Sequence, residues 1–187
     1  MGQQSGKTQL KAEEALKQPN SETLTVGAGC FWGVEAHFQK VNGVLNTACG
    51  YAMGTTKNPT YKEVCSKATN HAEVVRVIFD NKQVSYEELL DVFWAMHDPT
   101  TLNRQGPDSG TQYRSGIYTY SDEQMKKATA SLEEEQKNLA NCENDKIVTE
   151  IKPMKEFWEA EEYHQQFFDK NPHRSSCHRW RRRKKSF

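Results

Sequence analysis

Apolar and polar positions along the first half of the chain alternate in a way that predicts strands and helices in turn. Residues 23–28 are β-prone, and Phe31, Val34 and Phe38 follow them at the spacing of one helix face. Residues 44–49 and residues 72–79, AEVVRVIF, are rich in β-branched side chains, which favour strands. This half therefore predicts a strand that leads into a helix, followed by two further strands.

The second half contains clear helix starts. Ser85 and Glu88 form a capping-box pattern before an apolar run, which predicts a helix to about His97. Ser121, with Gln124 three positions later, predicts the start of a long charged helix that ends near residue 140.

Three further segments complete the predicted order of elements. Residues 114–120 and 146–151 are β-prone, and residues 157–168 are interpreted as a last helix that ends before Asn171-Pro172. Because strands and helices are mixed without a repeat, we predict one α+β domain, with helices packed on a mixed β-sheet and irregular N- and C-terminal extensions.

The chain has 187 residues, which fits a single domain with its own core. We expect residues 1–20 to be a polar, mobile N-terminal extension, residues 21–172 to form the domain, and residues 173–187 to be a basic C-terminal tail. Residues 51–70 and 99–113 are long irregular stretches, and loops of that length in a compact domain are usually functional or mobile.

The balanced charge, 25 Lys and Arg against 25 Asp and Glu, hides a strong segregation. Seven of the basic residues lie within residues 174–185, so residues 1–173 are acidic, and we expect no nucleic-acid binding by the domain. No apolar run is long enough to span a membrane, and the N-terminal residues lack the apolar core of a signal peptide. We therefore expect a cytoplasmic protein with no membrane partner. The tail sequence WRRRKK is either a nuclear localisation signal or a solvated end, and we favour the solvated end.

The five cysteines, an odd number with no CxxC pair, indicate a reducing compartment and not a disulfide scaffold. A zinc site made of Cys49, Cys65 and His71 would need a spacing unlike those of common zinc motifs, so we rank it low and expect no metal or organic cofactor. Cys30 stands out because GAGCFWG places it where a strand ends and a helix begins. The amide groups and positive end of a helix N-terminus favour a thiolate there.

Position alone leaves two interpretations of Cys30, a nucleophile or a buried structural cysteine at a tight turn. The aromatic residues Phe31 and Trp32 favour the nucleophile, because an apolar wall beside it suits a small apolar group on a substrate.

Five separated segments, in order, resemble the peptide methionine sulfoxide reductase A family: GCFWG, GYAMGTTKNPTYKEVC, HAEVVRVIFD, HDPTTLNRQGPDSGTQYRSGIY and AEEYHQQFF. The resemblance covers about residues 23–177. Met53 interrupts the GYAGG that is common in the family, and Lys67 and Asn70 replace glycines of its CSGxTGH motif. These differences predict a stiffer or differently shaped loop.

The resemblance implies a role for each matching residue. Cys30 would be the nucleophile and Glu73 the acid. Tyr61 and Tyr113 would donate hydrogen bonds, and Asp108 would support the same polar side of the pocket. Phe31 and Trp32 would hold the substrate methyl group. The chemistry needs these types, because a sulfoxide sulfur accepts a thiolate only when its oxygen is protonated or strongly hydrogen-bonded. For that purpose, burial should raise the pKa of Glu73.

The resemblance further implies reduction of methionine-S-sulfoxide, free or in proteins, with thioredoxin as reductant. We also expect the protein to be a monomer. A sulfenic acid on Cys30 would condense with a second thiol, for which we choose Cys177 in the tail, or be reduced directly by an external dithiol. Cys49, Cys65 and Cys142 are interpreted as structural or incidental.

Two other functions stay open at this point. One is a Cys-His hydrolase or acyltransferase that uses Cys30 with His71 or His97. The other is a non-enzymatic module that binds methionine-containing partners in the aromatic pocket.

Overall fold

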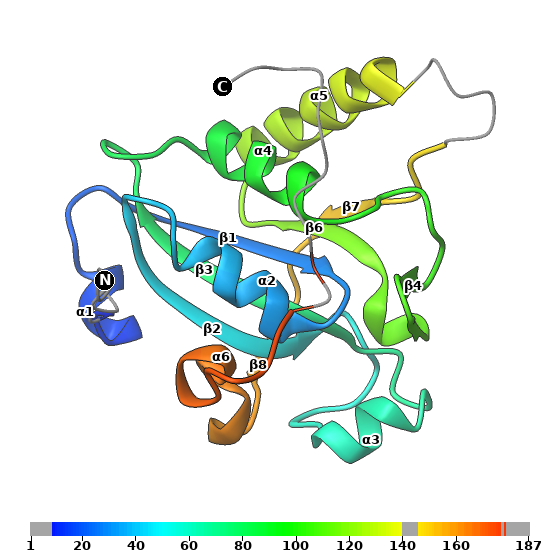
Figure 1. The fold of residues 1–187 in the computed structure, drawn as a ribbon. Coiled ribbons are helices and arrows are strands. Elements are labelled where there is room, and N and C mark those ends of the chain that lie inside the picture. The colour runs from blue at the N-terminus through cyan, green and yellow to red at the C-terminus, as the bar shows by residue number, and fades with distance from the viewer. Residues whose placement is uncertain (1–8, 140–145, 177, 179–187) are drawn as a thin grey trace.

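A computed structural model describes residues 9–139, 146–176 and 178. Within these residues, a six-stranded sheet has the order β7-β6-β1-β3-β2-β8 (Figure 1). Its neighbouring strands are antiparallel except for the parallel pair β6–β7, which makes the sheet mixed. The strands are β1 (Ser21–Ala28), β2 (Val44–Ala52), β3 (Ala72–Asp80), β6 (Ser115–Thr119), β7 (Glu150–Pro153) and β8 (Phe157–Glu159).

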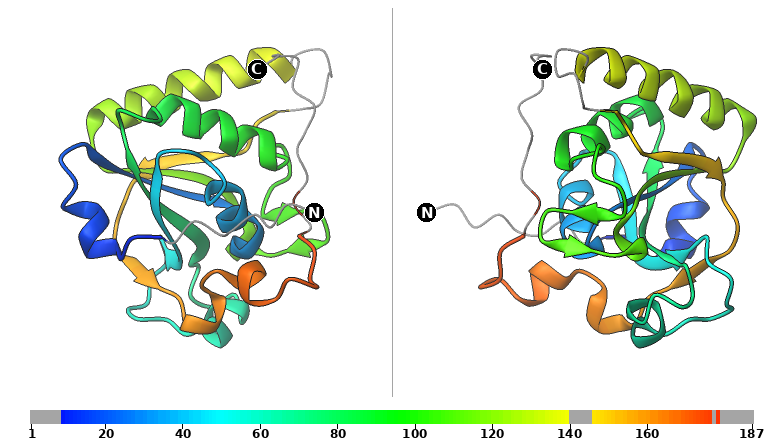
Figure 2. Two further views of the ribbon diagram at one scale, coloured as in Figure 1. Left: turned by 60° about the vertical axis from the view of Figure 1, so that its left-hand side comes forward. Right: turned by 90° about the vertical axis from the view of Figure 1, so that its right-hand side faces the viewer.

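Helices pack on this sheet, as Figures 1 and 2 show. Between the sheet and the helices lies one main apolar core. The core joins side chains of β1 and β3 to Phe31, Phe38, Phe93 and Trp94 from the helices. The described helices are α1 (Ala12–Leu16), α2 (Phe31–Phe38), α3 (Tyr61–Cys65), α4 (Tyr86–Met96), α5 (Asp122–Leu139) and α6 (Phe167–Lys170), with 3-10 turns η1 (Thr111–Tyr113) and η2 (Glu162–His164). A small hairpin, β4 (Arg104–Gln105) with β5 (Asp108–Ser109), lies outside the main sheet.

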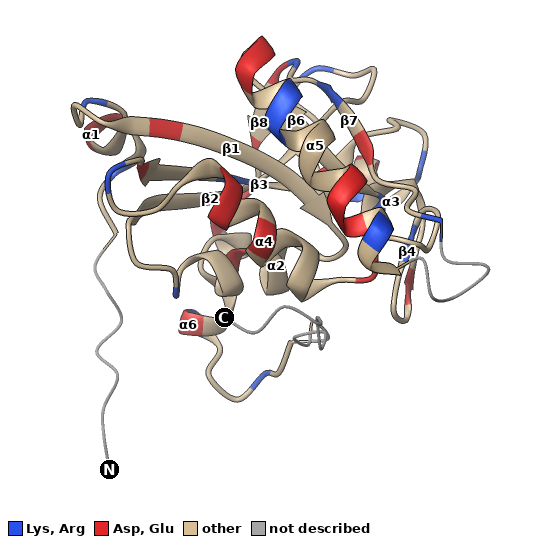
Figure 3. Ribbon diagram, turned by 90° about the horizontal axis from the view of Figure 1, so that it is seen from above, with Lys and Arg blue, Asp and Glu red and all other residues tan. Residues whose placement is uncertain are grey.

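The charged residues stay largely outside this core. Figure 3 shows Asp, Glu, Lys and Arg mainly on helices and loops, and β1 carries no charged residue after Glu22. The described part of the chain contains no helix that is long and apolar enough to cross a membrane.

The α+β class and most predicted elements are confirmed. The capping box of Ser85 and Glu88 is present in full, with the Ser85 hydroxyl accepting from the Glu88 amide and the Glu88 carboxylate accepting from the Ser85 amide. The strand predicted at residues 146–151 is present as β7, but it lies further along the chain, at Glu150–Pro153.

The predicted helix at residues 157–168 is wrong. Residues Phe157–Glu159 form β8, which pairs with Gly50–Ala52 of β2, and a 3-10 turn and the short helix α6 follow it. The aromatic spacing of this segment is compatible with a helix, but an available strand edge on β2 decides the outcome.

The N-terminal segment contacts the rest of the domain from Gln9 onward. The Leu10 amide donates to the Leu45 carbonyl at 3.2 Å, and Ala15 of α1 is fully buried. The Gln9 amide side chain also bonds Thr47 of β2. Residues 9–20 therefore cover part of the domain instead of extending from it.

Candidate active site

Cys30 is the N-cap residue of α2 and is half-buried. Gly29 before it has φ +91°, a left-handed conformation that favours glycine, and a Cβ there would lie 2.6 Å from the Cβ of Gln105. The glycine thus turns the chain sharply from β1 into α2 and lets the β4–β5 hairpin approach. The Cys30 thiol is placed at the helix end where amide groups and the helix dipole stabilise a thiolate.

Glu73 faces this helix start from the neighbouring strand β3. Its side chain is 1% exposed, and its Oε2 accepts a hydrogen bond from the Phe31 amide at 3.1 Å. Burial raises the pKa of Glu73 to about 8, and the negative charge of Asp108 adds to the rise, although the Phe31 amide opposes it. Glu73 therefore holds a proton at neutral pH, as the general acid predicted from the sequence must.

The structure brings the two predicted tyrosines and Asp108 into the electrostatic range of Glu73. Burial raises the pKa of Tyr113, and the charges of Glu73, Asp108, Cys65 and Cys30 raise it further. Burial likewise raises the pKa of Tyr61, as do its hydrogen bond with Cys65 and the charge of Glu73. Both phenols thus keep their protons and can serve as hydrogen-bond donors.

Aromatic residues form an apolar wall beside Cys30. Phe31 is buried, while the half-buried Trp32 stacks on Phe167 of α6, with ring centroids 3.7 Å apart and planes 4° from parallel. The Trp32 indole Nε1 donates to His164 Nδ1 at 3.0 Å. His164 is fully buried, and its ring lies 4.9 Å from that of Phe31 and 4.6 Å from that of Tyr61.

His164, Phe167 and Glu161 belong to the segment AEEYHQQFF, to which the sequence interpretation gave no role. The Glu161 carboxylate accepts from the Tyr51 hydroxyl at 2.9 Å and from the Tyr61 amide at 3.1 Å, and so ties this segment to α3. Within the described residues, the buried Nε2 of His164 has no hydrogen-bond partner. This segment is one of the five that carry the family resemblance, which was a signal that it has a functional role. The sequence alone does not tell which of its side chains face the pocket, because that depends on the fold.

A second cysteine lies nearby, but in a very different setting. Cys49 on β2 is fully buried, and its thiol donates to Glu35 Oε2 at 3.4 Å. Glu35 also accepts from the Thr47 hydroxyl at 3.0 Å and from the Gln166 amide at 2.7 Å. Burial raises the pKa of Cys49 well above its usual value and that of Glu35 to about 7. Cys49 is therefore a buried thiol that keeps its proton.

The two histidines of the hydrolase alternative are engaged elsewhere. His71 Nδ1 accepts from the Gly54 amide at 3.1 Å, so its Nε2 carries the proton that it donates to the Thr56 carbonyl at 2.7 Å. His97 Nδ1 donates to the Phe93 carbonyl at 2.7 Å, and its Nε2 lies 2.8 Å from the Ser115 hydroxyl. These bonds occupy both ring nitrogens of each histidine, which disfavours either as the base for Cys30.

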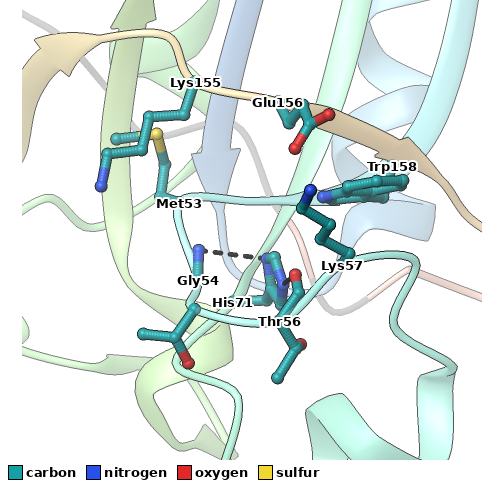
Figure 4. Close-up of a pocket in the computed structure, with 9 residues that line it drawn as sticks. Met53, Gly54, Thr56, Lys57, His71, Lys155, Glu156 and Trp158 are labelled. Atoms are coloured by element: carbon teal, nitrogen blue, oxygen red, sulfur yellow. Dashed lines mark hydrogen bonds between the residues drawn. The ribbon is translucent and has the colours of Figure 1, made fainter.

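His71 is part of a separate pocket of about 160 Å³, shown in Figure 4. The residues that line it come from the loop after β2 and from the segment around β8: Met53, Gly54, Thr55, Thr56, Lys57, His71, Lys155, Glu156 and Trp158. This set includes no predicted catalytic residue. Nor do the described residues contain a group of three His, Cys, Asp or Glu side chains that could hold a metal ion.

In the loop after β2, three residues that stand where the family motifs have glycine adopt the left-handed backbone conformation that favours glycine. Met53, Lys67 and Asn70 have φ values of 67°, 65° and 53°, all left-handed. Side chains with a Cβ atom adopt this conformation at an energetic cost. The stiffer or differently shaped loop stays a prediction.

Of the predicted site residues, Cys177 lies outside the described residues, as do Cys142 and most of the basic tail. The other predicted residues gather around the start of α2, where β1, β2 and β3 end or begin.

A half-buried thiol at a helix N-terminus, with a buried carboxyl group of raised pKa, two phenols and a cluster of aromatic rings nearby, is typical of a thiol-dependent enzyme. Its site suits a substrate with both a polar oxygen and a small apolar group. The family model described as peptide methionine sulfoxide reductase matches residues 22–187, and the chain belongs to this family.

The relatives agree with the family assignment. The chain is 56% identical over 158 residues to peptide methionine sulfoxide reductase A1 of Arabidopsis thaliana, covering 84% of this chain and 76% of that protein. The crystal structure of Mxr1 from Saccharomyces cerevisiae in reduced form is similar, with a TM-score of 0.82, 40% identity and coverage of 88% and 95%. Mxr1 in complex with Trx2 has a TM-score of 0.60, 27% identity and coverage of 88% and 94%.

Proposed function

We propose that this protein reduces methionine-S-sulfoxide, free or in proteins, to methionine. The observation that carries the proposal is the buried Glu73, whose pKa is raised to about 8 and whose carboxyl group accepts from the amide of the residue after Cys30. A protonated carboxyl group beside a thiolate supplies what a sulfoxide requires, an acid for its oxygen and a nucleophile for its sulfur.

In this mechanism the Cys30 thiolate attacks the sulfoxide sulfur, while Glu73 gives its proton to the oxygen. Tyr61 and Tyr113 donate hydrogen bonds to the same oxygen, and Asp108 helps to keep Glu73 protonated through its negative charge. Phe31 and Trp32 hold the substrate methyl group. Oxygen passes from methionine to Cys30, which becomes a sulfenic acid as methionine leaves.

Recycling needs two further thiol reactions. The Cys177 thiol attacks the Cys30 sulfenic acid, water leaves, and a disulfide forms that an external dithiol reduces by exchange. Thioredoxin is the proposed reductant, which the Mxr1 structure in complex with Trx2 supports.

The enzyme is proposed to act as a monomer in the cytoplasm, where thiols stay reduced, with the basic tail as a solvated end. A tagged full chain and a variant with its WRRRKK basic residues changed to Ala should then show the same cellular distribution. Loss of nuclear signal in the variant would assign the tail to nuclear import.

Incubation with a methionine sulfoxide peptide and dithiothreitol tests the function. Only a reductase forms methionine and consumes dithiol; a hydrolase would leave the dithiol unused, and a binding module would leave the peptide unchanged. The peptide with the S epimer should react and the one with the R epimer should not. Equal turnover of both epimers would contradict the proposed stereospecificity.

A further inference from the structure

The segment after α6 returns to the start of α2 and places a histidine beside it. His178 is 7% exposed, and its Nε2 donates to the carbonyl oxygen of Ala28 at 2.6 Å. Ala28 is the last residue of β1 and lies two positions before Cys30. The hydrogen bond thus joins the C-terminal segment to the turn that carries the nucleophile.

Two glycines of this turn and helix make room for the imidazole ring. A Cβ at position 33 would collide with the ring of His178 and lie 2.5 Å from the Ser176 hydroxyl, so the contact requires glycine there. A Cβ at Gly29 would lie 3.4 Å from His178 Nε2. The two glycines therefore leave space for the histidine, although the segment around the histidine itself, residues 171–187, contains no glycine.

Further contacts fix the orientation of the ring. The His178 amide donates to the Ser176 hydroxyl at 3.0 Å. The ring meets that of His37 edge-on, at 6.2 Å between centroids, while His37 Nδ1 lies 2.8 Å from the Gly33 carbonyl. Burial lowers the pKa of His178, so the ring is docked as a neutral donor.

We propose that His178 is a positioning residue that docks the C-terminal segment against Gly29, in the turn before α2, and Gly33, in α2, and so delivers the second thiol to Cys30. This inference rests on the proposed function, in which Cys177 is that thiol. Cys177 itself lies outside the described residues, and the peptide bonds to Ser176 and His178 are what link it to the docked groups.

Docking serves the second step of the cycle. The Cys177 thiolate attacks the sulfur of the Cys30 sulfenic acid, an S–S bond forms, and the S–OH bond breaks. The hydroxide takes up the proton that the thiol released and leaves as water, so no further oxidant is needed. Holding two reacting groups in one place raises their effective concentration, and loss of the docking contacts should slow this step.

The test uses three variants and one control in the full-length chain. His178→Ala removes the docking side chain, whereas His178→Gln keeps an N–H donor near the position of Nε2. Gly33→Ala leaves His178 intact but adds the Cβ that would collide with it, and alanine in a helix favours the fold. His173→Ala is the matched control, because His173 is an exposed histidine of the same segment.

Each reduced protein is mixed with one equivalent of methionine sulfoxide, and both methionine release and disulfide formation are followed in time. We expect His178→Ala and Gly33→Ala to release methionine like the parent but to form the disulfide about tenfold more slowly. Their longer-lived sulfenic acid should give more dimedone adduct. His178→Gln should recover much of the rate, and His173→Ala should match the parent.

Disulfide formation at the parent rate in both His178→Ala and Gly33→Ala would overturn the inference. The same comparison with hydrogen peroxide, which oxidises the Cys30 thiolate to a sulfenic acid and releases water, does not depend on sulfoxide chemistry. A parent protein that releases no methionine would therefore contradict the proposed function, while the peroxide arm would still decide whether His178 positions the second thiol.

Discussion

Cys30 and Cys49 lie close enough that the charge of Cys30 raises the pKa of Cys49. Each cysteine has a buried glutamate of raised pKa near it: Glu35 accepts from the Cys49 thiol, and Glu73 accepts from the amide of the residue after Cys30. Their settings differ in backbone position. Cys30 begins a helix and is half-buried, whereas Cys49 is fully buried within a strand and donates its S–H to Glu35. The same pair of functional groups thus leaves a half-buried thiol at a helix start in one place, where we propose the nucleophile, and forms a buried hydrogen bond in the other.

The two glutamates differ in the same way. The carboxylate oxygens of Glu35 accept hydrogen bonds from the Thr47 hydroxyl, the Cys49 thiol and the Gln166 amide. Glu73 accepts a hydrogen bond from the amide of Phe31, the residue after Cys30, and the charge of Asp108 also acts on it. A carboxyl group can transfer a proton to a substrate only where its partners leave it accessible, so reactivity follows the surroundings and not the residue type.

The largest expected effect separates the two cysteines. Cys30→Ser should lower the rate of sulfoxide turnover to background even with excess dithiothreitol, because a hydroxyl group at neutral pH does not replace a thiolate. Cys49→Ser should keep activity within a few-fold of the parent and lower the free energy of unfolding by about 1 kcal/mol, since a hydroxyl is costlier to bury. Turnover assays and urea unfolding measure both, and turnover by Cys30→Ser would end the assignment.

Next in size is the contrast between the two glutamates. Glu73→Gln keeps shape and a donor but loses the transferable proton, so the single-turnover rate should fall about 10²- to 10⁴-fold. Glu35→Gln should change that rate only a few-fold. Equal losses in the two variants, measured by rapid quench, would show that Glu73 has no special role as the acid.

A smaller effect concerns stability and pH. The folded pKa of Glu73, about 8, lies above its ordinary value of 4.5, so between these values the folded state binds a proton that the unfolded chain has released. Stability should therefore fall as pH rises from about 5 to 8. In Glu73→Gln, the free energy of unfolding should fall by a few kcal/mol less over the same pH range. Urea titrations at both pH values test the effect, and an unchanged slope in the variant would contradict the raised pKa.

The smallest effect concerns the left-handed residues after β2. Lys67 has φ 65°, so Lys67→Gly should raise the free energy of unfolding by about 0.5–1 kcal/mol by relieving backbone strain. Lys62→Gly within α3 is the control, and it should lower stability because glycine weakens a helix. If both variants lose stability in thermal unfolding, the left-handed residue carries no strain.

Particular residues show how far the sequence could lead. The motifs identified Cys30, Glu73 and the tyrosines, and the Ser85 capping box located α4, because these signals are local. The pairing of Cys49 with Glu35 and the strand at residues 157–159 depend on which segments meet in space. Local patterns carry no such information, and the contact of His178 with Gly33 was unpredictable for the same reason.

The most direct measurement locates the oxygen after one turnover. Reduced Cys177→Ser protein, which lacks the proposed second thiol, is mixed with one equivalent of methionine sulfoxide and dimedone and then mapped by peptide mass spectrometry. The proposed mechanism predicts one equivalent of methionine and a dimedone adduct on the peptide that contains Cys30. An adduct on Cys49 or Cys65, or methionine formed without any adduct, would contradict it.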